Sequence, residues 1–76
     1  MPVLVALMLG NSVEAQKISQ KELYHTCLKK TGLTPKDAFE DAIQWHSEGG
    51  GAPAQHCAAS ALMELGLFKA AANRLE

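Results

Sequence analysis

The last third of the chain carries a pattern that leaves few possible folds. From residue 54 to residue 65, small or apolar side chains recur every three or four positions, at Ala54, Cys57, Ala58, Ala61, Leu62 and Leu65. This spacing gathers them on one face of a helix. Gly66 comes next, and glycine commonly ends a helix because it adopts the left-handed backbone conformation without strain. A second stripe follows directly, so the stretch predicts a helix, a short turn and another helix. Its members are Leu67, Phe68, Ala71, Ala72 and Leu75.

Two further helices are predicted before this pair. Ser19 and Glu22 have the spacing of a capping box, in which each side chain satisfies a backbone N–H at the start of a helix. Thr34 followed by Pro35 is a second start signal, since proline is favoured at the first helical position. Residues 49–51 are all glycine and close that helix. No alternating strand pattern follows residue 16, so we expect an all-α fold with helices near residues 18–31, 35–48, 52–65 and 67–76.

The two pairs of predicted helices repeat at a fixed interval. Gly32 and Gly66 are 34 residues apart, and the same interval separates Leu28 from Leu62, Leu33 from Leu67, and Ala38 from Ala72. A helix–turn–helix unit that recurs every 34 residues is the signature of tetratricopeptide arrays. Residues 52–76 resemble a tetratricopeptide repeat that lacks the end of its second helix, and residues 17–51 resemble a more degenerate copy.

The resemblance rests on positions of residues 52–76 that have the small or apolar character of the family consensus: Ala58, Ala59, Leu62, Ala71 and Leu75. The chain departs from the consensus where the family has an early tryptophan, which is Lys21 in the first copy and Gln55 in the second. The segment from Ala38 to Trp45, with the glycines and the His56–Leu62 segment after it, also looks like bacterial secreted repeat proteins of this class. The resemblance implies antiparallel helical hairpins stacked as a fragment of a TPR-like α-solenoid.

The same resemblance implies a function in protein–protein interaction. Stacked repeats of this kind act as scaffolds or adaptors, and the first helix of each unit lines a groove for a peptide or partner protein. The polar residues of those helices are the candidate contacts, namely Lys21, His25, Gln55 and Ser60. A single repeat cannot bury its own apolar face. We therefore expect an exposed apolar surface on the last two helices, covered by further repeats of a longer chain or by self-association through this open C-terminal face.

Residues 1–16 differ in kind from the rest of the chain. Val3–Leu9 is an unbroken apolar run, and Val13–Ala15 supplies short residues of the kind that a signal peptidase reads. We therefore expect a signal-peptide remnant and export, into the bacterial periplasm, with a cytoplasmic location as the alternative. The other interpretation of the run is a short buried helix or strand that caps the domain. The seven apolar residues of the run cannot form a membrane anchor, because a spanning helix needs about 20.

The charges of the chain are balanced. Seven basic and eight acidic residues give a net charge of −1, with no run of either sign, which argues against nucleic-acid binding. The two cysteines, Cys27 and Cys57, are too few for a disulfide-rich scaffold. In an oxidising compartment they could form a disulfide. The alternative is a pair of buried thiols that pack as small apolar groups.

The candidate metal ligands are His25, Cys27, His46, His56 and Cys57. A structural zinc site needs four converging ligands, usually in paired short motifs, and adjacent helical residues such as His56 and Cys57 diverge by about 100°. The glycines at 49–51 lack the lysine and hydroxyl residue of a phosphate loop. We therefore expect no enzyme activity, no metal and no cofactor. The alternative is a small stand-alone helical bundle that binds a metal or cofactor through His25, Cys27, His56 and Cys57.

Overall fold

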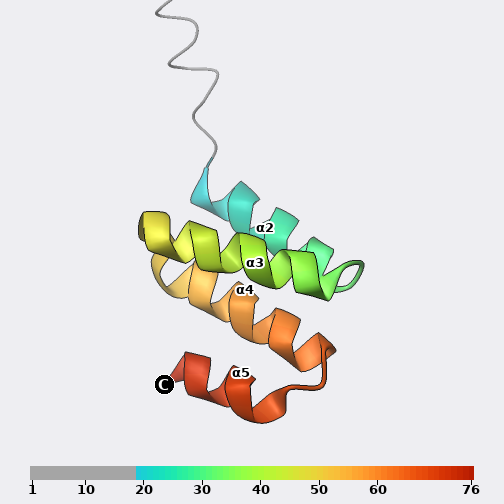
Figure 1. Cartoon of the computed structure of the whole chain (residues 1–76). Coiled ribbons are helices and arrows are strands. Elements are labelled where there is room, and N and C mark those ends of the chain that lie inside the picture. The colour runs from blue at the N-terminus through green and yellow to red at the C-terminus, as the bar shows by residue number, and fades with distance from the viewer. Residues whose placement is uncertain (1–18) are drawn as a thin grey trace, which may run out of the picture.

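The computed structural model describes residues 19–76, which form helices joined by short turns (Figure 1). The α-helices are α2 (Gln20–Thr31), α3 (Pro35–Trp45), α4 (Gly51–Glu64) and α5 (Phe68–Leu75), and a wide helical turn, η1 (His46–Gly50), joins α3 to α4. No strand occurs between residues 19 and 76, so the all-α prediction is confirmed for this part of the chain. The signal peptide expected at residues 1–16 lies outside the described residues.

The predicted ends of the helices agree with the structure to within three residues. The start signals explain this agreement, because Ser19 Oγ accepts a hydrogen bond from the backbone N–H of Glu22 at 3.1 Å, as a capping residue does. Pro35 is the first residue of α3. The largest difference is at the end of α3, where the regular helix stops at Trp45 and the backbone widens into η1. Gly49, with φ of 100°, then breaks the helical course.

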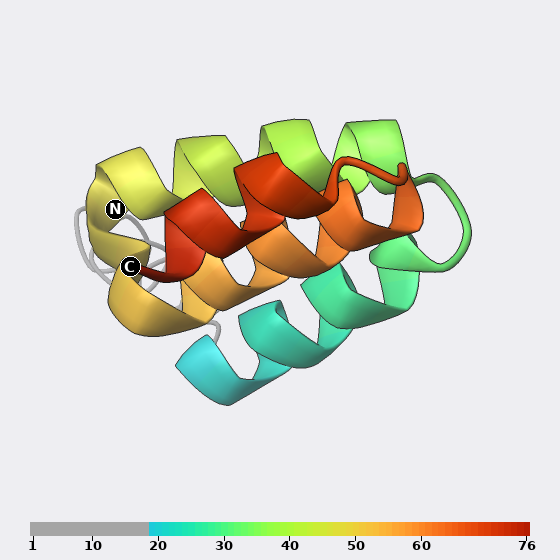
Figure 2. The same cartoon turned by 90° about the horizontal axis from the view of Figure 1, so that it is seen from below.

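Helix α4 lies at the centre of the packing and contacts α2, α3 and α5 (Figures 1 and 2). Its buried face consists almost entirely of small side chains: Ala54, Cys57, Ala58, Ala59, Ala61 and Leu62. On α3, Ala38 and Ala42 are also completely buried. Small side chains let helix backbones approach closely, and they leave little apolar area per residue in the core.

The core consists of two clusters that meet at Phe39. One contains Cys27, Ala42, Cys57 and Ala58, with the partly buried Leu28, Ile43 and Trp45 packed against it. The other contains Ala59, Leu62 and Ala71. Leu28 and Leu62, which are 34 residues apart, therefore belong to different clusters, and Leu28 is the more exposed of the two.

The two glycine corners that the 34-residue spacing relates have different backbone conformations. Gly66 has φ of 78°, and the N–H groups of Gly66 and Leu67 donate to the carbonyls of Met63 and Leu62 at 3.0 and 2.9 Å. This pattern is a Schellman motif, which requires a left-handed residue. Gly32 has φ of −81°, a conformation open to any residue. The two glycines therefore recur at a fixed interval in the sequence, but their backbone conformation does not recur.

Candidate interaction surfaces

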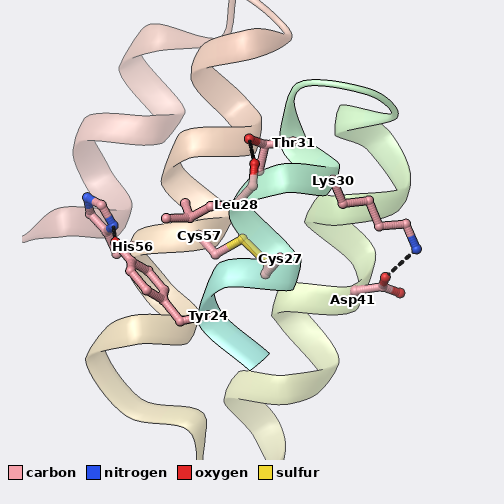
Figure 3. Close-up of a disulfide and its surroundings, with 8 residues drawn as sticks. All are labelled: Tyr24, Cys27, Leu28, Lys30, Thr31, Asp41, His56 and Cys57. Carbon is pink, nitrogen blue, oxygen red and sulfur yellow. Dashed lines mark hydrogen bonds and ion pairs between the residues drawn. A yellow bond between two sulfur atoms is a disulfide. The ribbon is translucent and has the colours of Figure 1, made fainter. Parts of the chain in front are cut away.

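A disulfide joins Cys27 of α2 to Cys57 of α4, with the two Cα atoms 6.2 Å apart (Figure 3). Cys57 is completely buried and Cys27 is 7% exposed. Of the two alternatives that the sequence leaves open, the structure contains the disulfide rather than two packed thiols. Both sulfur atoms are bonded to each other, so neither is a thiolate that could bind a metal or attack a substrate.

A tyrosine–histidine pair, Tyr24 of α2 and His56 of α4, lies beside the disulfide (Figure 3). Tyr24 Oη and His56 Nδ1 share a hydrogen bond, and their rings are 5.7 Å apart. The pair borders a mostly apolar cavity of about 510 Å³ between the starts of α2 and α4 and the end of α5. Its lining residues are Gln20, Lys21, Tyr24, Ala52, Pro53, His56 and Leu75.

The four predicted partner contacts do not gather at one site. Lys21 is exposed and lines the cavity beside Tyr24, whereas His25 is exposed without lining it. Ser60 is half-buried. The side chain of Gln55 is bound within the fold, because it accepts from Arg74 Nη1 at 3.0 Å and its Nε2 donates to the Arg74 carbonyl at 3.2 Å.

Arg74 holds the end of α5 against its neighbours. Besides its two hydrogen bonds to Gln55 of α4, its guanidinium lies 5.6 Å from the ring centre of Phe39 of α3, within the range of a cation–π contact. Gln55 therefore has a structural partner, which reduces its availability to a second protein. The signal that could have revealed this pairing is the spacing of 19 residues across the α4–α5 corner, which brings residue 74 back beside residue 55.

Large apolar side chains remain exposed around the α4–α5 corner and along α5. Leu65 is 41% exposed, Leu67 52%, Phe68 64% and Leu75 60%. We call these four residues the C-terminal apolar surface. The exposed apolar surface expected on the last two helices is therefore present.

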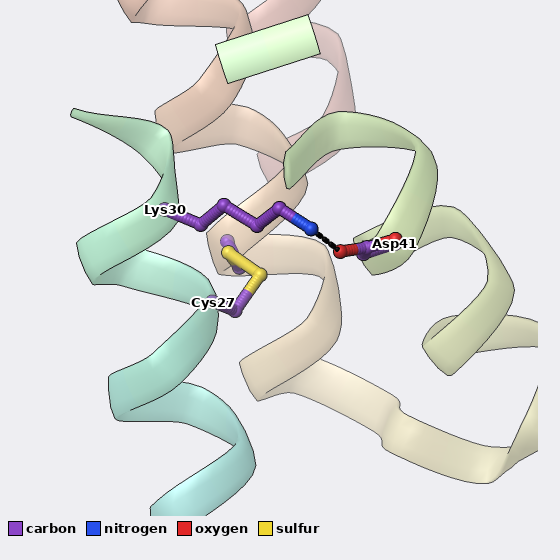
Figure 4. Close-up of polar contacts among 4 residues, drawn as sticks. Cys27, Lys30 and Asp41 are labelled. Atoms are coloured by element: carbon purple, nitrogen blue, oxygen red, sulfur yellow. Dashed lines mark hydrogen bonds and ion pairs between the residues drawn. A yellow bond between two sulfur atoms is a disulfide. The ribbon is translucent and has the colours of Figure 1, made fainter. Parts of the chain in front are cut away.

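A groove of about 510 Å³ lies between α2 and α3. Its lining residues are Glu22, Leu23, Thr26, Cys27, Lys30, Asp41, Gln44, Trp45 and Glu48. An ion pair crosses it beside Cys27, with Lys30 Nζ 2.6 Å from Asp41 Oδ2 (Figure 4). The hydrogen bond to Asp41 and the charge of the same carboxylate raise the pKa of Lys30 above its usual value of 10.5. No local sequence pattern predicts this groove, because its residues come from two helices that only packing brings together.

Within residues 19–76, no group of three or more His, Cys, Asp or Glu side chains is arranged to hold a metal ion. In the same part of the chain, no helix has the length and apolar character needed to cross a membrane. The chain matches no known family model, no characterised protein and no solved structure.

Proposed function

We propose that the protein is a protein–protein interaction module of the helical-repeat kind, which receives a helix or helical hairpin of a partner protein on its C-terminal apolar surface. The observation that carries this proposal is the exposure of Leu65, Leu67 and Phe68 at the α4–α5 corner and of Leu75 at the other end of α5. Single exposed leucines are ordinary in folded proteins. A group of large apolar side chains on one hairpin is typical of an interaction site.

The geometry of α5 suits a helical partner. Phe68, Ala72 and Leu75 are spaced by four and three residues, which places them on one side of the helix. Ala71, which is 1% exposed, packs with Ala59 and Leu62 of α4. A partner helix laid along α5 would therefore meet anchors at i, i+4 and i+7, the spacing used when an amphipathic helix occupies an apolar groove.

The backbone corners at Gly32 and Gly66 differ, so the 34-residue spacing does not itself support the proposal, but hairpin packing in helical repeats is a model for such a contact. In stacked repeats, each hairpin covers the apolar face that its neighbour leaves open. The C-terminal apolar surface would be the face on which the next hairpin packs, whether that hairpin belongs to another protein or to a second copy of this chain. The alternative of a metal- or cofactor-binding bundle is less favoured, because the disulfide uses both cysteine sulfurs.

A photo-crosslinking experiment tests the proposal directly. Phe68 is replaced by p-benzoylphenylalanine, and a matched chain carries the same photoreactive residue in place of Glu40, which is exposed on α3. We expect an adduct with a discrete partner from position 68 and not from position 40, and we expect Leu75→Ser to weaken it. An adduct with twice the mass of the chain would identify self-association. Equal labelling from both positions, or none from position 68, would refute the proposal.

The disulfide also bears on the compartment in which the module works. Disulfides persist in oxidising compartments and are rare in the cytosol. The disulfide and the signal-like sequence of residues 1–16 together support export, and we propose that the protein works in the periplasm of a bacterium. Fusion of the chain to a reporter that is active only outside the cytoplasm tests it. Reporter activity that is unchanged on deletion of residues 1–16 would contradict export through this segment.

A further inference from the structure

The groove between α2 and α3 combines an apolar floor with an acidic rim. Leu23, Cys27 and Trp45 supply apolar lining, and Thr26 and Gln44 supply neutral polar lining. The charged lining residues are three carboxylates and one ammonium: Glu22, Asp41, Glu48 and Lys30. The rim therefore has a net charge of −2, from three negative charges and one positive charge, in a chain whose overall charge is only −1.

Two of the three carboxylates lack a cationic partner within the described part of the chain. Lys30 Nζ lies 2.6 Å from Asp41 Oδ2, and this contact is the one ion pair within residues 19–76. Glu22 accepts a hydrogen bond from the hydroxyl of Ser19 at 3.4 Å, and Glu48 accepts one from the amide of Gln44 at 3.3 Å. Both donors are neutral, and both carboxylates are exposed. The unneutralised charge of the groove therefore lies at Glu22 and Glu48.

Trp45 is the aromatic residue that lines the groove. One edge of its indole packs on Gly50, where an added Cβ would lie 2.7 Å from both Cδ1 and Nε1. This close packing fixes the orientation of the ring. The face of a tryptophan ring attracts cations more strongly than the face of a tyrosine or phenylalanine ring does. Lysine and arginine match such a site, because their methylene stems cover apolar surface while the charged head remains at the rim.

We propose that this groove binds a basic segment of a partner protein, with a lysine or arginine stem against Leu23 and Trp45 and its charged head between Glu22 and Glu48. The inference concerns a different pair of helices from the C-terminal apolar surface and does not rest on it. The acidic rim disfavours a phosphate-bearing partner such as a nucleic acid, because like charges repel. A lysine or arginine of a protein segment fits this lining, because one side chain carries both an apolar stem and a positively charged head.

The single tryptophan of the chain lies in the groove and therefore reports occupancy by its fluorescence. The probe is a synthetic peptide of alternating lysine and alanine, titrated at low salt into the oxidised full-length protein. A glutamate–alanine peptide of the same length is the control ligand. We expect a saturable change in tryptophan emission with the lysine peptide only, and weaker binding as salt is added.

Two double variants of equal net charge separate groove binding from general attraction. Glu22→Gln with Glu48→Gln removes the rim charges and keeps the hydrogen-bonding capacity of both side chains. Glu40→Gln with Glu64→Gln removes two exposed carboxylates that do not line the groove. We expect the first variant to weaken binding about fivefold or more and the second to change it less than twofold. Far-UV circular dichroism confirms that both variants are folded. No saturable response to the lysine peptide, or equal weakening by both variants, would overturn the proposal.

Discussion

The difference between the two glycine corners predicts opposite effects for the same substitution. Gly66→Ala places a Cβ on a residue with φ of 78°, in open space where no atom lies within 4 Å. Its cost is therefore the backbone strain alone, about 1–2 kcal/mol for an L-residue in the left-handed region. We expect Gly66→Ala to destabilise the protein by this strain, less the smaller gain that alanine makes at any glycine site by restricting the unfolded chain.

Gly32→Ala is expected to have no such cost. Gly32 has φ of −81° and ψ of −15°, and the nearest atom to an added Cβ is the Lys29 carbonyl oxygen at an ordinary 3.7 Å. Alanine loses less conformational freedom on folding than glycine does, so a compatible replacement stabilises by about 0.4–1 kcal/mol. Because this gain arises in the unfolded chain and is common to both substitutions, the two variants should differ by the strain at Gly66, about 1–2 kcal/mol, in their free energies of unfolding.

Thermal unfolding of the oxidised protein, followed by far-UV circular dichroism, measures this difference. For a chain of this size, 1 kcal/mol shifts the midpoint by roughly 4–8 °C. Gly66→Ala should thus melt below the wild-type protein, and Gly32→Ala should melt at or above it. If both variants lose the same number of degrees, the corners are equivalent and the conformational difference described for them is wrong.

Three further predictions concern the core, η1 and the ion pair. Replacing Cys27 and Cys57 by serine removes a cross-link between residues 30 apart in sequence, and we expect the free energy of unfolding in urea to fall by about 3.5 kcal/mol. Reductant should not change the stability of this variant, because it has no disulfide to reduce. Gly50→Ala should cost about 1–3 kcal/mol in the same assay, because its Cβ would overlap the indole, and wild-type stability would contradict that contact. Because the folded-state pKa of Lys30 is raised above 10.5, stability from its pair with Asp41 is complete below that pH and is lost as pH rises through the raised pKa. Asp41→Asn should return the pKa of Lys30, measured by NMR titration, toward its usual value, and an unchanged titration would contradict the assigned cause.

Local sequence signals were sufficient to predict the helices and insufficient to predict how they meet. Ser19, Pro35 and Gly66 each act on the backbone next to them, so their effect does not depend on tertiary packing. The sign of φ at Gly32 is not encoded in this way, because glycine adopts both signs about equally well. The 34-residue interval between the glycines therefore could not reveal that their corners differ.

The candidate sites depended even more on packing. The expected divergence of adjacent helical residues is observed, since Cys57 is buried while His56 is exposed beside Tyr24. Gln55 shows the opposite outcome. Its polar side chain predicts exposure, but the α4–α5 corner brings Arg74 next to it, and the two form hydrogen bonds. Which polar residues remain free for a partner is therefore decided by contacts between residues far apart in sequence.

The composition of the core connects the stability of this protein to its proposed interaction. Cys57 is the largest side chain that is fully buried in the described part of the chain, and most of its buried neighbours are alanines. Such a core gains little from apolar burial, since each alanine removes little area from water. We therefore expect the disulfide to contribute a large share of the stability, while Phe68 and Leu75 keep apolar area exposed that a partner would bury. Because a partner that binds only the folded state stabilises it in proportion to its affinity and concentration, occupancy of the C-terminal apolar surface should protect the reduced protein from unfolding.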